Sequence, residues 1–253
     1  MSENPYESPE CSPPPAIGKK WKPPSVVEIL VLIAIVAVLL ALIIPVPQSA
    51  STSASRMQCK NNLKMIALAL HNYHDFYEAF PPAYTLDENG QRLHSWRTLI
   101  LPWLEHSDRY QKLDLSKPWN HPVNGEAFKT TPDFFRCPGS VLTQDSTTYL
   151  AVVGENACFH PTKPTAISEI TDGTSNTIMV IEVPVKQAVH WMSPQDADEP
   201  MILNISNDDK LAHAGGVQAA LADGSVRFLS ATIAPETRRA LISINGKEVV
   251  GEW

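Results

Sequence analysis

Residues 26–44 form a continuous apolar run, VVEILVLIAIVAVLLALII, in which Glu28 is the only charged residue. As a helix that rises ~1.5 Å per residue, this run would be about 28 Å long, close to the hydrocarbon thickness of a bilayer. A buried helix of a water-soluble protein normally has a polar face, and this run has none after Glu28. The sequence therefore predicts a single transmembrane helix over residues 25–45, with the lipid bilayer as a partner.

The charges before the run predict its orientation. Lys19, Lys20 and Lys22 precede it, and positive charge on the cytoplasmic side predicts that the N-terminus stays in the cytoplasm. The chain is then a single-pass protein of the cytoplasmic (inner) membrane, and its C-terminal domain is periplasmic or extracytoplasmic. A cleaved signal peptide is the alternative, because the sequence SAS at 49–51 resembles a cleavage site. Its apolar core would be shorter, about 7–15 residues.

The segments on either side of the run have different compositions. Residues 1–24 contain seven prolines and almost no apolar side chains, so we expect a disordered Pro-rich cytoplasmic tail. Two prolines and a Ser/Thr/Ala sequence predict a short flexible stalk at 46–55. Helix is expected to resume near Ser55, which forms a capping-box pattern with Gln58. Residues 56–253 remain for an extracytoplasmic domain, which is enough chain for a hydrophobic core.

The periodicity of this domain predicts an α+β fold. Apolar residues recur at intervals of three and four along a first helix that ends before Pro81: Cys59, Leu63, Ile66, Leu70, Tyr73 and Tyr77. Ser95 is expected to cap a second helix. Short β-rich runs then predict strands at 148–153, 177–183, 201–205, 217–222 and 226–230, and Pro235 begins a last helix. This order predicts a long helix packed on one face of an antiparallel sheet.

Charge and cysteine usage narrow the class of protein further. The net charge of −7 provides no basic face, so we expect no nucleic-acid partner. Cys59, Cys137 and Cys158 follow the apolar run, where an oxidising compartment permits one disulfide with one thiol left over. Three buried free thiols fit the spacing nearly as well.

The sequence PPSVVE at 23–28, followed by the apolar run, resembles the N-terminus of type IV prepilins. In those proteins a peptidase cuts after a glycine and the new amine is methylated. The resemblance implies that Glu28 would pair with the N-terminus of a neighbouring subunit during assembly. Here Pro23 occupies the glycine position and Pro24 the first mature position. Because proline restricts the backbone around this bond, we expect no cleavage and a permanently anchored chain.

A series of further motifs is similar to the DUF1559 family. They are RMQCKNNLK at 56–64, LALHNYH at 68–74, FPP at 80–82, SWR at 95–97, ILPWLE at 100–105, FRCP at 135–138, YLAVVG at 149–154 and DGTSNTI at 172–178. His213, nine further residues and then Asp223-Gly224 resemble the H-X9-DG element of such prepilin-like proteins. The resemblance covers about residues 23–230 and implies a pseudopilin-like protein with a pilin-like domain. It also implies a disulfide between Cys59 and Cys137, which both occupy family motif positions.

Polar residues at three places are candidate sites. His213 and Asp223 suit an acid–base pair, but Asp223-Gly224 is also the expected sequence of a hairpin turn, which favours a structural or interaction role. An oxygen-rich stretch suits calcium but lacks the spacing of a calcium loop, and an Asx-type turn explains it equally well. Its residues are Asp172, Gly173 and Asn176.

The third place is the first helix of the domain. His71 and Asp75 are four residues apart, which suits a hydrogen-bonded pair, and His74 lies beside them. A metal site there would need further ligands that the sequence does not identify. No motif of a serine hydrolase, a zinc protease or a phosphate-binding loop appears. We expect no catalytic residue, no metal and no cofactor.

The sequence thus favours a membrane-anchored, pseudopilin-like extracytoplasmic protein with a non-enzymatic role in binding or envelope assembly. Its expected partners are other pseudopilin-like or envelope proteins. One alternative is a solute- or glycan-binding module, which would need an aromatic-lined pocket; the available tryptophans are Trp96, Trp103, Trp119 and Trp191. A second alternative is an envelope hydrolase, which would need His213 and Asp223 to meet a nucleophile in a cleft.

Overall fold

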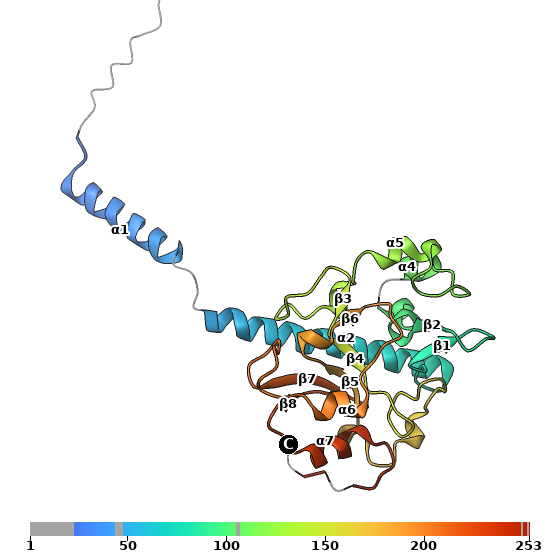
Figure 1. Ribbon diagram of the computed structural model, residues 1–253. Helices are drawn as coiled ribbons and strands as arrows, with labels where there is room; N and C mark the ends of the chain where they lie inside the picture. The colour runs from blue at the N-terminus through green and yellow to red at the C-terminus, as the bar shows by residue number, and fades with distance from the viewer. Residues whose placement is uncertain (1–22, 44–47, 105–106, 249, 252) are drawn as a thin grey trace, which may run out of the picture. The chain divides into compact units, whose positions relative to one another are not determined.

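The computed structural model describes residues 23–43, 48–104, 107–248, 250–251 and 253 of the chain (Figure 1). It divides into two units, Met1–Val46 and Pro47–Trp253. Several expectations fall outside the described residues, wholly or in part, including the first two residues of the stalk at 46–55. The others are the tail at 1–24 (described only from residue 23), the end of the predicted transmembrane helix at residues 44–45 and the motif residue Glu105.

The first unit contains helix α1 (Val26–Ile43). A capping box starts this helix: the Ser25 backbone N–H donates to Glu28 Oε2 (2.8 Å), and the Glu28 N–H donates to Ser25 Oγ (3.3 Å). The large apolar side chains described in α1 are exposed, among them Val26 (74%) and Ile33 (60%). Among the residues that the structure describes, no helix combines the length and the apolar character that a membrane crossing requires.

The second unit begins with helix α2 (Gln48–Tyr77), which is 30 residues long. The prediction of a flexible stalk at 46–55 is therefore wrong from residue 48 onward, and the helix starts seven residues before Ser55. The prolines stop at Pro47, and the sequence QSASTSAS that follows contains nothing that breaks a helix. The expected apolar stripe is buried from Cys59 to Leu70, whereas Tyr77 at the end of α2 is 54% exposed.

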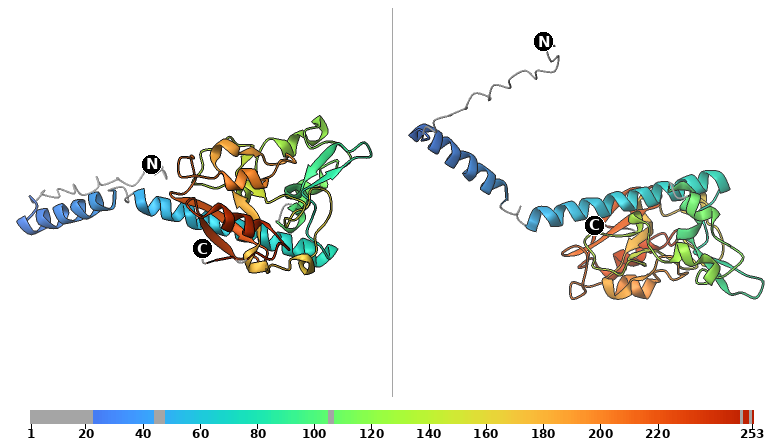
Figure 2. Two further views of the ribbon diagram at one scale, coloured as in Figure 1. Left: turned by 60° about the horizontal axis from the view of Figure 1, so that its bottom comes forward. Right: turned by 90° about the horizontal axis from the view of Figure 1, so that it is seen from above.

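A four-stranded antiparallel sheet lies against α2. Its strand order is β4-β5-β7-β8, and the strands are β4 (Tyr149–Ala151), β5 (Ile178–Glu182), β7 (Gly216–Leu221) and β8 (Val226–Ser230). All three pairings are antiparallel. The predicted α+β class and the helix-on-sheet packing are confirmed, because α2 contacts β5, β7 and β8 (Figure 2).

The two faces of the sheet carry two apolar clusters. On the α2 side, Leu63 and Ile66 pack in one cluster with Tyr149, Val180 and Ala220. On the other side, Leu150, Ile181 and Val217 pack with residues of two short helices, α6 (Glu199–Leu203) and α7 (Pro235–Ile242). Side chains alternate between the faces of a strand, so each strand supplies both clusters. The sheet is consequently buried on both faces.

Shorter elements complete the domain. The remaining strands pair in two-stranded sheets: β1 (Tyr84–Leu86) with β2 (Arg92–Ser95), and β3 (Ser146–Thr147) with β6 (Val189–His190). The remaining α-helices are α3 (Trp96–Leu99), α4 (Ser107–Gln111) and α5 (Gly125–Phe128). Within the described residues, the 3₁₀ turns are Leu101–Trp103, Pro122–Asn124, Asp133–Phe135, Ile167–Glu169, Thr174–Asn176 and Val185–Gln187.

Two expectations about these short elements need correction. The stretch 201–205 is not a strand, because α6 covers Glu199–Leu203; Asp198 caps that helix by accepting a hydrogen bond from Met201 N (2.9 Å). The second predicted helix is only the single turn of α3, followed by a 3₁₀ turn at Pro102. Ser95 precedes α3 but makes no side-chain capping bond.

Candidate functional site

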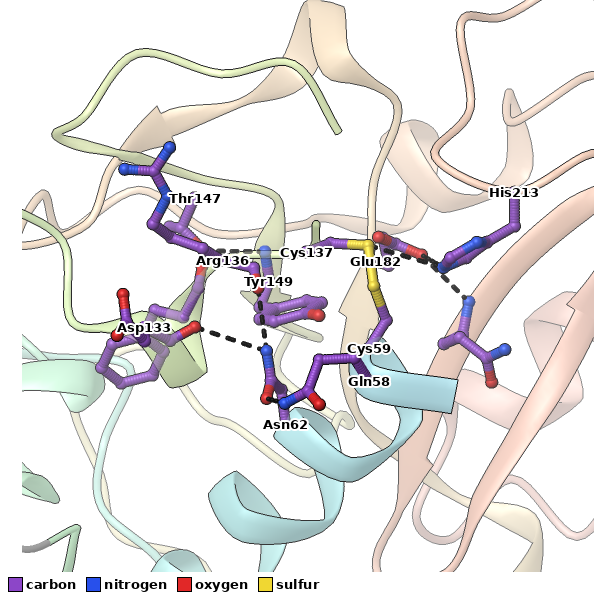
Figure 3. Close-up of a disulfide and its surroundings, with 12 residues drawn as sticks. Gln58, Cys59, Asn62, Asp133, Arg136, Cys137, Thr147, Tyr149, Glu182 and His213 are labelled. Carbon is purple, nitrogen blue, oxygen red and sulfur yellow. Dashed lines mark hydrogen bonds and ion pairs between the residues drawn. A yellow bond between two sulfur atoms is a disulfide. The ribbon is translucent and has the colours of Figure 1, made fainter. Parts of the chain in front are cut away.

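A disulfide between Cys59 and Cys137 joins α2 to the loop that follows the 3₁₀ turn Asp133–Phe135 (Figure 3). The two Cα atoms are 5.1 Å apart, across a sequence separation of 78 residues. Both cysteines are buried. The pairing that the family resemblance implied is therefore confirmed. Cys158 is the cysteine left over; it is free and buried, and burial raises the pKa of its thiol.

The loop that carries Cys137 is fixed to α2 by side-chain hydrogen bonds. Asn62, less than one helical turn after Cys59, donates through Nδ2 to the carbonyl oxygens of Arg136 (2.8 Å) and Asp133 (3.3 Å). Gln58 Nε2 in turn donates to Asn62 Oδ1 (2.9 Å), which orients the amide. Figure 3 shows these contacts beside the disulfide. The disulfide thus lies in a junction that is also held by polar contacts.

A buried carboxyl group faces this junction from the sheet. Glu182 is the last residue of β5, pairs in register with Tyr149 of β4, and is completely buried. Its Oε2 accepts a long hydrogen bond from the backbone N–H of Gln218 (3.5 Å). Burial raises the pKa of Glu182 to about 8, although the Gln218 bond opposes the change. The side chain is therefore a neutral carboxylic acid at neutral pH.

His213 closes the cluster from the loop before β7. Its Nε2 is 3.5 Å from Cys137 Sγ and 3.5 Å from Glu182 Oε2, and the side chain is 1% exposed. Burial, and then the positive charge of Arg56, lower the pKa of the imidazole. A neutral imidazole and a neutral carboxylic acid thus lie against the disulfide. Such an arrangement is compatible with burial because neither group carries charge.

The approach of these loops leaves little space. A Cβ on Gly139, two residues after Cys137, would lie 2.8 Å from the carbonyl oxygen of Ala212 and 3.3 Å from His213 Cε1. Glycine at 139 therefore permits the Cys137 loop to pack directly on the His213 loop. Cys59 Sγ, Cys137 Sγ, a Glu182 oxygen and a His213 nitrogen all lie within 4.8 Å of one another. These four atoms belong to residue types that bind transition metals.

Comparison with known proteins identifies part of the chain. A family model described as "Protein of unknown function (DUF1559)" matches residues 48–154. Residues 48–154 are thus similar to the DUF1559 family. No curated protein and no solved structure matches the chain. The DUF1559 match contains both disulfide cysteines, whereas Glu182 and His213 lie beyond it.

His213 and Asp223 do not form an acid–base pair. They lie at opposite ends of β7, which is six residues long and therefore spans roughly 20 Å. Asp223 is in the β7–β8 turn, where its Oδ1 accepts a hydrogen bond from Ser225 N (2.8 Å). Gly224 follows with φ +81°, a conformation that glycine adopts without strain. The structural interpretation of Asp223-Gly224 is thus supported, and His213 belongs to the disulfide cluster.

The two other predicted groups also have structural roles. Asp172 accepts backbone hydrogen bonds at both carboxylate oxygens, from Gly246 N (2.7 Å) and Lys247 N (2.9 Å), which secures the C-terminal segment. Asn176 Nδ2 donates to the Asp172 carbonyl oxygen at 3.4 Å, and Gly173 between them has φ +97°. These contacts favour the turn over the calcium alternative.

The histidines of α2 have separate environments. His74 Nε2 accepts a hydrogen bond from the backbone N–H of Ile167 (3.2 Å). His71 lies beside the hairpin turn, with Nε2 3.5 Å from the position that a Cβ would take at Gly224. Burial and the nearby His74 lower the pKa of His71, although Asp75 and Asp223 raise it. The two histidines therefore connect α2 to two different parts of the domain.

Sequence reasoning missed Glu182, which is central to the cluster. The signal was present, because Glu182 is the only charged residue in the predicted strand at 177–183. An ionisable residue in a strand that is apolar on both sides predicts a buried carboxyl with a special partner. The sequence could not show which loops would bring Cys137 and His213 to it.

Proposed function

We propose that this chain is a single-pass protein anchored in the cytoplasmic membrane, with a pseudopilin-like domain on the extracytoplasmic side. The apolar run supports the anchor. The structure describes side chains in it as far as residue 39, and five further apolar residues follow in the sequence, through Ile44. Every large apolar side chain described in the run is exposed, and such a surface is stable only against lipid or another apolar partner. The lysines at 19, 20 and 22 support a cytoplasmic N-terminus.

The observation that carries the extracytoplasmic placement is the Cys59–Cys137 disulfide. Structural disulfides persist in oxidising compartments and are rare in the cytosol, where thiols are kept reduced. The disulfide lies in the second unit, which follows the apolar run in the sequence. An anchored chain with its N-terminus inside places this unit outside, so the topology and the redox requirement agree.

The contacts of Glu28 support an anchor that stays unprocessed. In a prepilin-type assembly the glutamate would meet the free amine of a neighbouring subunit. Here the Glu28 carboxylate already accepts the backbone N–H of Ser25 from its own chain. Pro23 and Pro24 also disfavour cleavage at the prepilin position. We therefore propose a permanently anchored relative and not a filament subunit.

An apolar strip on the outer face of α2 supports a role in protein assembly. Met57, Met65, Leu68 and Phe76 share one side of the helix and are 67%, 47%, 55% and 71% exposed. The opposite side of α2 is buried against the sheet. Exposed apolar residues that repeat along a helix are typical of surfaces that bind proteins. The proposed partners are other pseudopilin-like or envelope proteins, and the proposed role is non-enzymatic.

One observation favours a second candidate function, ligand binding. A surface pocket of about 530 Å³ lies between α2 and β8, with Phe228 and Trp253 beside the cations Arg56, Lys60 and Arg227. This lining suits a ligand that carries both a ring and a negative charge. The tryptophans expected to line such a pocket contribute less, since Trp96 and Trp191 are completely buried in the core. An envelope hydrolase would need His213 and Asp223 as an acid–base pair, and these two residues are too far apart to form one.

Fractionation and N-terminal sequencing of the full chain test the proposed function. We expect the chain in the membrane fraction after an alkaline wash, with its first 24 residues retained. A matched variant, Pro23→Gly with Pro24→Phe, restores the prepilin pattern and should be cut by a prepilin peptidase in the same cells. Recovery of the native chain in the soluble fraction, or with a methylated N-terminus near residue 24, would contradict the proposal.

A further inference from the structure

We propose that the Cys59–Cys137 cluster becomes a Zn²⁺ site when the disulfide is reduced, with two thiolates, one imidazole and one carboxylate as ligands. The ligands are Cys59, Cys137, His213 and Glu182. This inference concerns a state of the chain before disulfide formation, and it does not depend on where the domain is located. Its evidence is the geometry, the burial and the unpartnered atoms of these four residues.

The geometry brings the four ligand atoms together from four separate segments. Cys59 comes from α2, Cys137 from the loop after the 3₁₀ turn Asp133–Phe135, Glu182 from the end of β5 and His213 from the loop before β7. Their ligand atoms lie within 4.8 Å of one another, and all four residues are buried. In Figure 3 the Glu182 carboxyl and the His213 ring both point toward the sulfur atoms. Ligands from four segments make a site that forms only in the folded chain.

The distances suit zinc after a small movement of the sulfur atoms. In a tetrahedral site with Zn–S bonds of ~2.3 Å, the two sulfurs lie about 3.7 Å apart. Breaking the S–S bond lets the two sulfurs move apart by side-chain rotation, while the Cα atoms stay 5.1 Å apart. Two thiolates with an imidazole and a carboxylate are a ligand set that zinc accepts, and thiolates disfavour magnesium and calcium.

Two polar atoms of the cluster have no hydrogen-bond partner within the described part of the chain. They are Glu182 Oε1 and His213 Nδ1, and Glu182 is completely buried. A buried polar atom without a partner costs about 1–3 kcal/mol, so such atoms need an explanation. A zinc ion bound by Glu182 Oε1 would give this oxygen a partner and would compensate the charge of the buried carboxylate. His213 would bind the ion through Nε2, the nitrogen that lies 3.5 Å from Cys137 Sγ.

The chemistry of the change is a two-electron reduction followed by metal binding. A dithiol transfers two electrons and two protons to the Cys59–Cys137 bond and becomes a cyclic disulfide. The S–S bond breaks and two protein thiols form. Zn²⁺ then displaces the two thiol protons and the carboxyl proton of Glu182, which solvent takes up. In the reverse direction a disulfide oxidant takes two electrons from the two thiolates and two protons from solvent, and becomes a dithiol. The Cys59–Cys137 bond forms again, the zinc leaves and Glu182 takes up a proton. The same junction is then held by a metal in one state and by a covalent bond in the other.

The test uses the full chain in detergent with Cys158→Ser, which removes the third buried thiol. The chain is reduced with a dithiol in denaturant, freed of reductant, and refolded with Co²⁺ or Zn²⁺. We expect one Co²⁺ per chain, with a thiolate-to-cobalt charge-transfer band and a tetrahedral visible spectrum that one equivalent of Zn²⁺ abolishes. The oxidised chain should show neither band.

Variants distinguish the proposed site from other metal binding. His213→Ala should weaken Zn²⁺ binding by at least ~10-fold. Even the loss of a group that only hydrogen-bonds to a metal ligand weakens metal binding about 10- to 100-fold. His121→Ala, at an exposed histidine, should bind like the parent chain. Retained affinity in His213→Ala, or equal binding by the oxidised chain, would overturn the proposal.

A measurement of folding keeps the test valid if the reduced chain is unstable without metal. If the metal-free reduced chain does not fold, Zn²⁺ should restore the circular dichroism of the oxidised chain, and a Cys59→Ser, Cys137→Ser variant should not respond to Zn²⁺. A reduced chain that folds without binding either metal overturns the proposal. A reduced chain that stays unfolded both with and without Zn²⁺ overturns it as well.

Discussion

At the scale of single residues, Arg97 of α3 makes a buried ion pair and hydrogen bonds that join this helix to the core. The side chain is completely buried, and its Nη1 is 2.7 Å from Asp196 Oδ1. Its Nε and Nη2 donate to three backbone carbonyl oxygens within residues 191–195, at 2.8–2.9 Å. Asp196 Oδ1 also accepts bonds from Trp96 Nε1 and Ala151 N, both 2.9 Å long. The charges of Arg97 and Asp196 both have partners. The pair therefore fixes the loop at residues 191–196 to β4 without leaving an uncompensated buried charge.

Removing one member of this pair should be costly. Asp196→Ala leaves the Arg97 guanidinium buried without a counter-charge, and we expect a loss of about 3–5 kcal/mol in the free energy of unfolding. Urea titration of the oxidised chain measures this loss. Glu126→Ala, which removes the exposed ion pair with Lys129, should leave the unfolding midpoint unchanged. Equal midpoints for the two variants would contradict this account of Arg97.

The buried acid predicts how stability depends on pH. The pKa of Glu182 rises from 4.5 in the unfolded chain to about 8 in the folded one, so folding favours the protonated form. The contribution of this group is fully present below pH ~4.5 and is lost as pH rises through about 8. We therefore expect Glu182→Gln to gain stability relative to the oxidised parent chain as pH rises from about 5 to 8. The gain should reach at most about 1.4 kcal/mol per pH unit.

Denaturant titrations at several pH values measure this gain. The control is Glu88→Gln, because the Glu88 side chain is exposed and should not change the pH slope. A stability difference between Glu182→Gln and the parent that does not vary with pH would show that Glu182 is ionised in the folded chain.

At the scale of helices and strands, regularly spaced apolar residues in the sequence predicted the correct elements. Elements that depend on single polar contacts were missed. The stripe from Cys59 to Leu70 and the strands β4, β5, β7 and β8 followed from apolar spacing. Helix α6 was predicted as a strand because its apolar residues outweighed the Asp198 cap before it. Its other end depends on Arg238, which is distant in sequence and donates to the carbonyl oxygens of Ile202, Leu203 and Ile205. No local pattern could reveal that contact.

Neighbouring arginines on α7 test the role of this contact. Arg238→Met leaves the carbonyl groups at the end of α6 without their donor, and we expect a loss of about 2–4 kcal/mol in unfolding free energy. Arg239→Met removes a half-exposed ion pair with Glu199 and should cost less than about 1 kcal/mol. Thermal unfolding of both variants gives the comparison. A larger loss for Arg239→Met would be inconsistent with the proposed capping role.

The disulfide should contribute to stability by joining α2 to a distant loop. In the loop-entropy model, closing a loop of 78 residues stabilises the fold by roughly 4 kcal/mol. The Cys59→Ala, Cys137→Ala double variant, in a chelator, should lose about that amount relative to the oxidised chain. Adding a reductant should destabilise the parent chain and leave the double variant unchanged, and a response of the double variant to reductant would contradict this assignment.

At the scale of the whole molecule, the two units described by the structure call for different surroundings. The described apolar side chains of α1 are exposed, whereas the second unit buries its sheet on both faces and closes a disulfide. The apolar run and its flanking lysines could be read from the sequence, because hydropathy and charge are local properties. The cluster of Cys59, Cys137, Glu182 and His213 could not, because four separate segments form it.

We propose that residues 26–44 anchor the chain and that its domain lies outside the cytoplasmic membrane. The test of this placement is to add protease to intact spheroplasts that express the full chain with a tag at each end. We expect the C-terminal tag to be lost while the N-terminal tag stays protected in the membrane fraction. A C-terminal tag that resists protease until the membrane is lysed would contradict the claim.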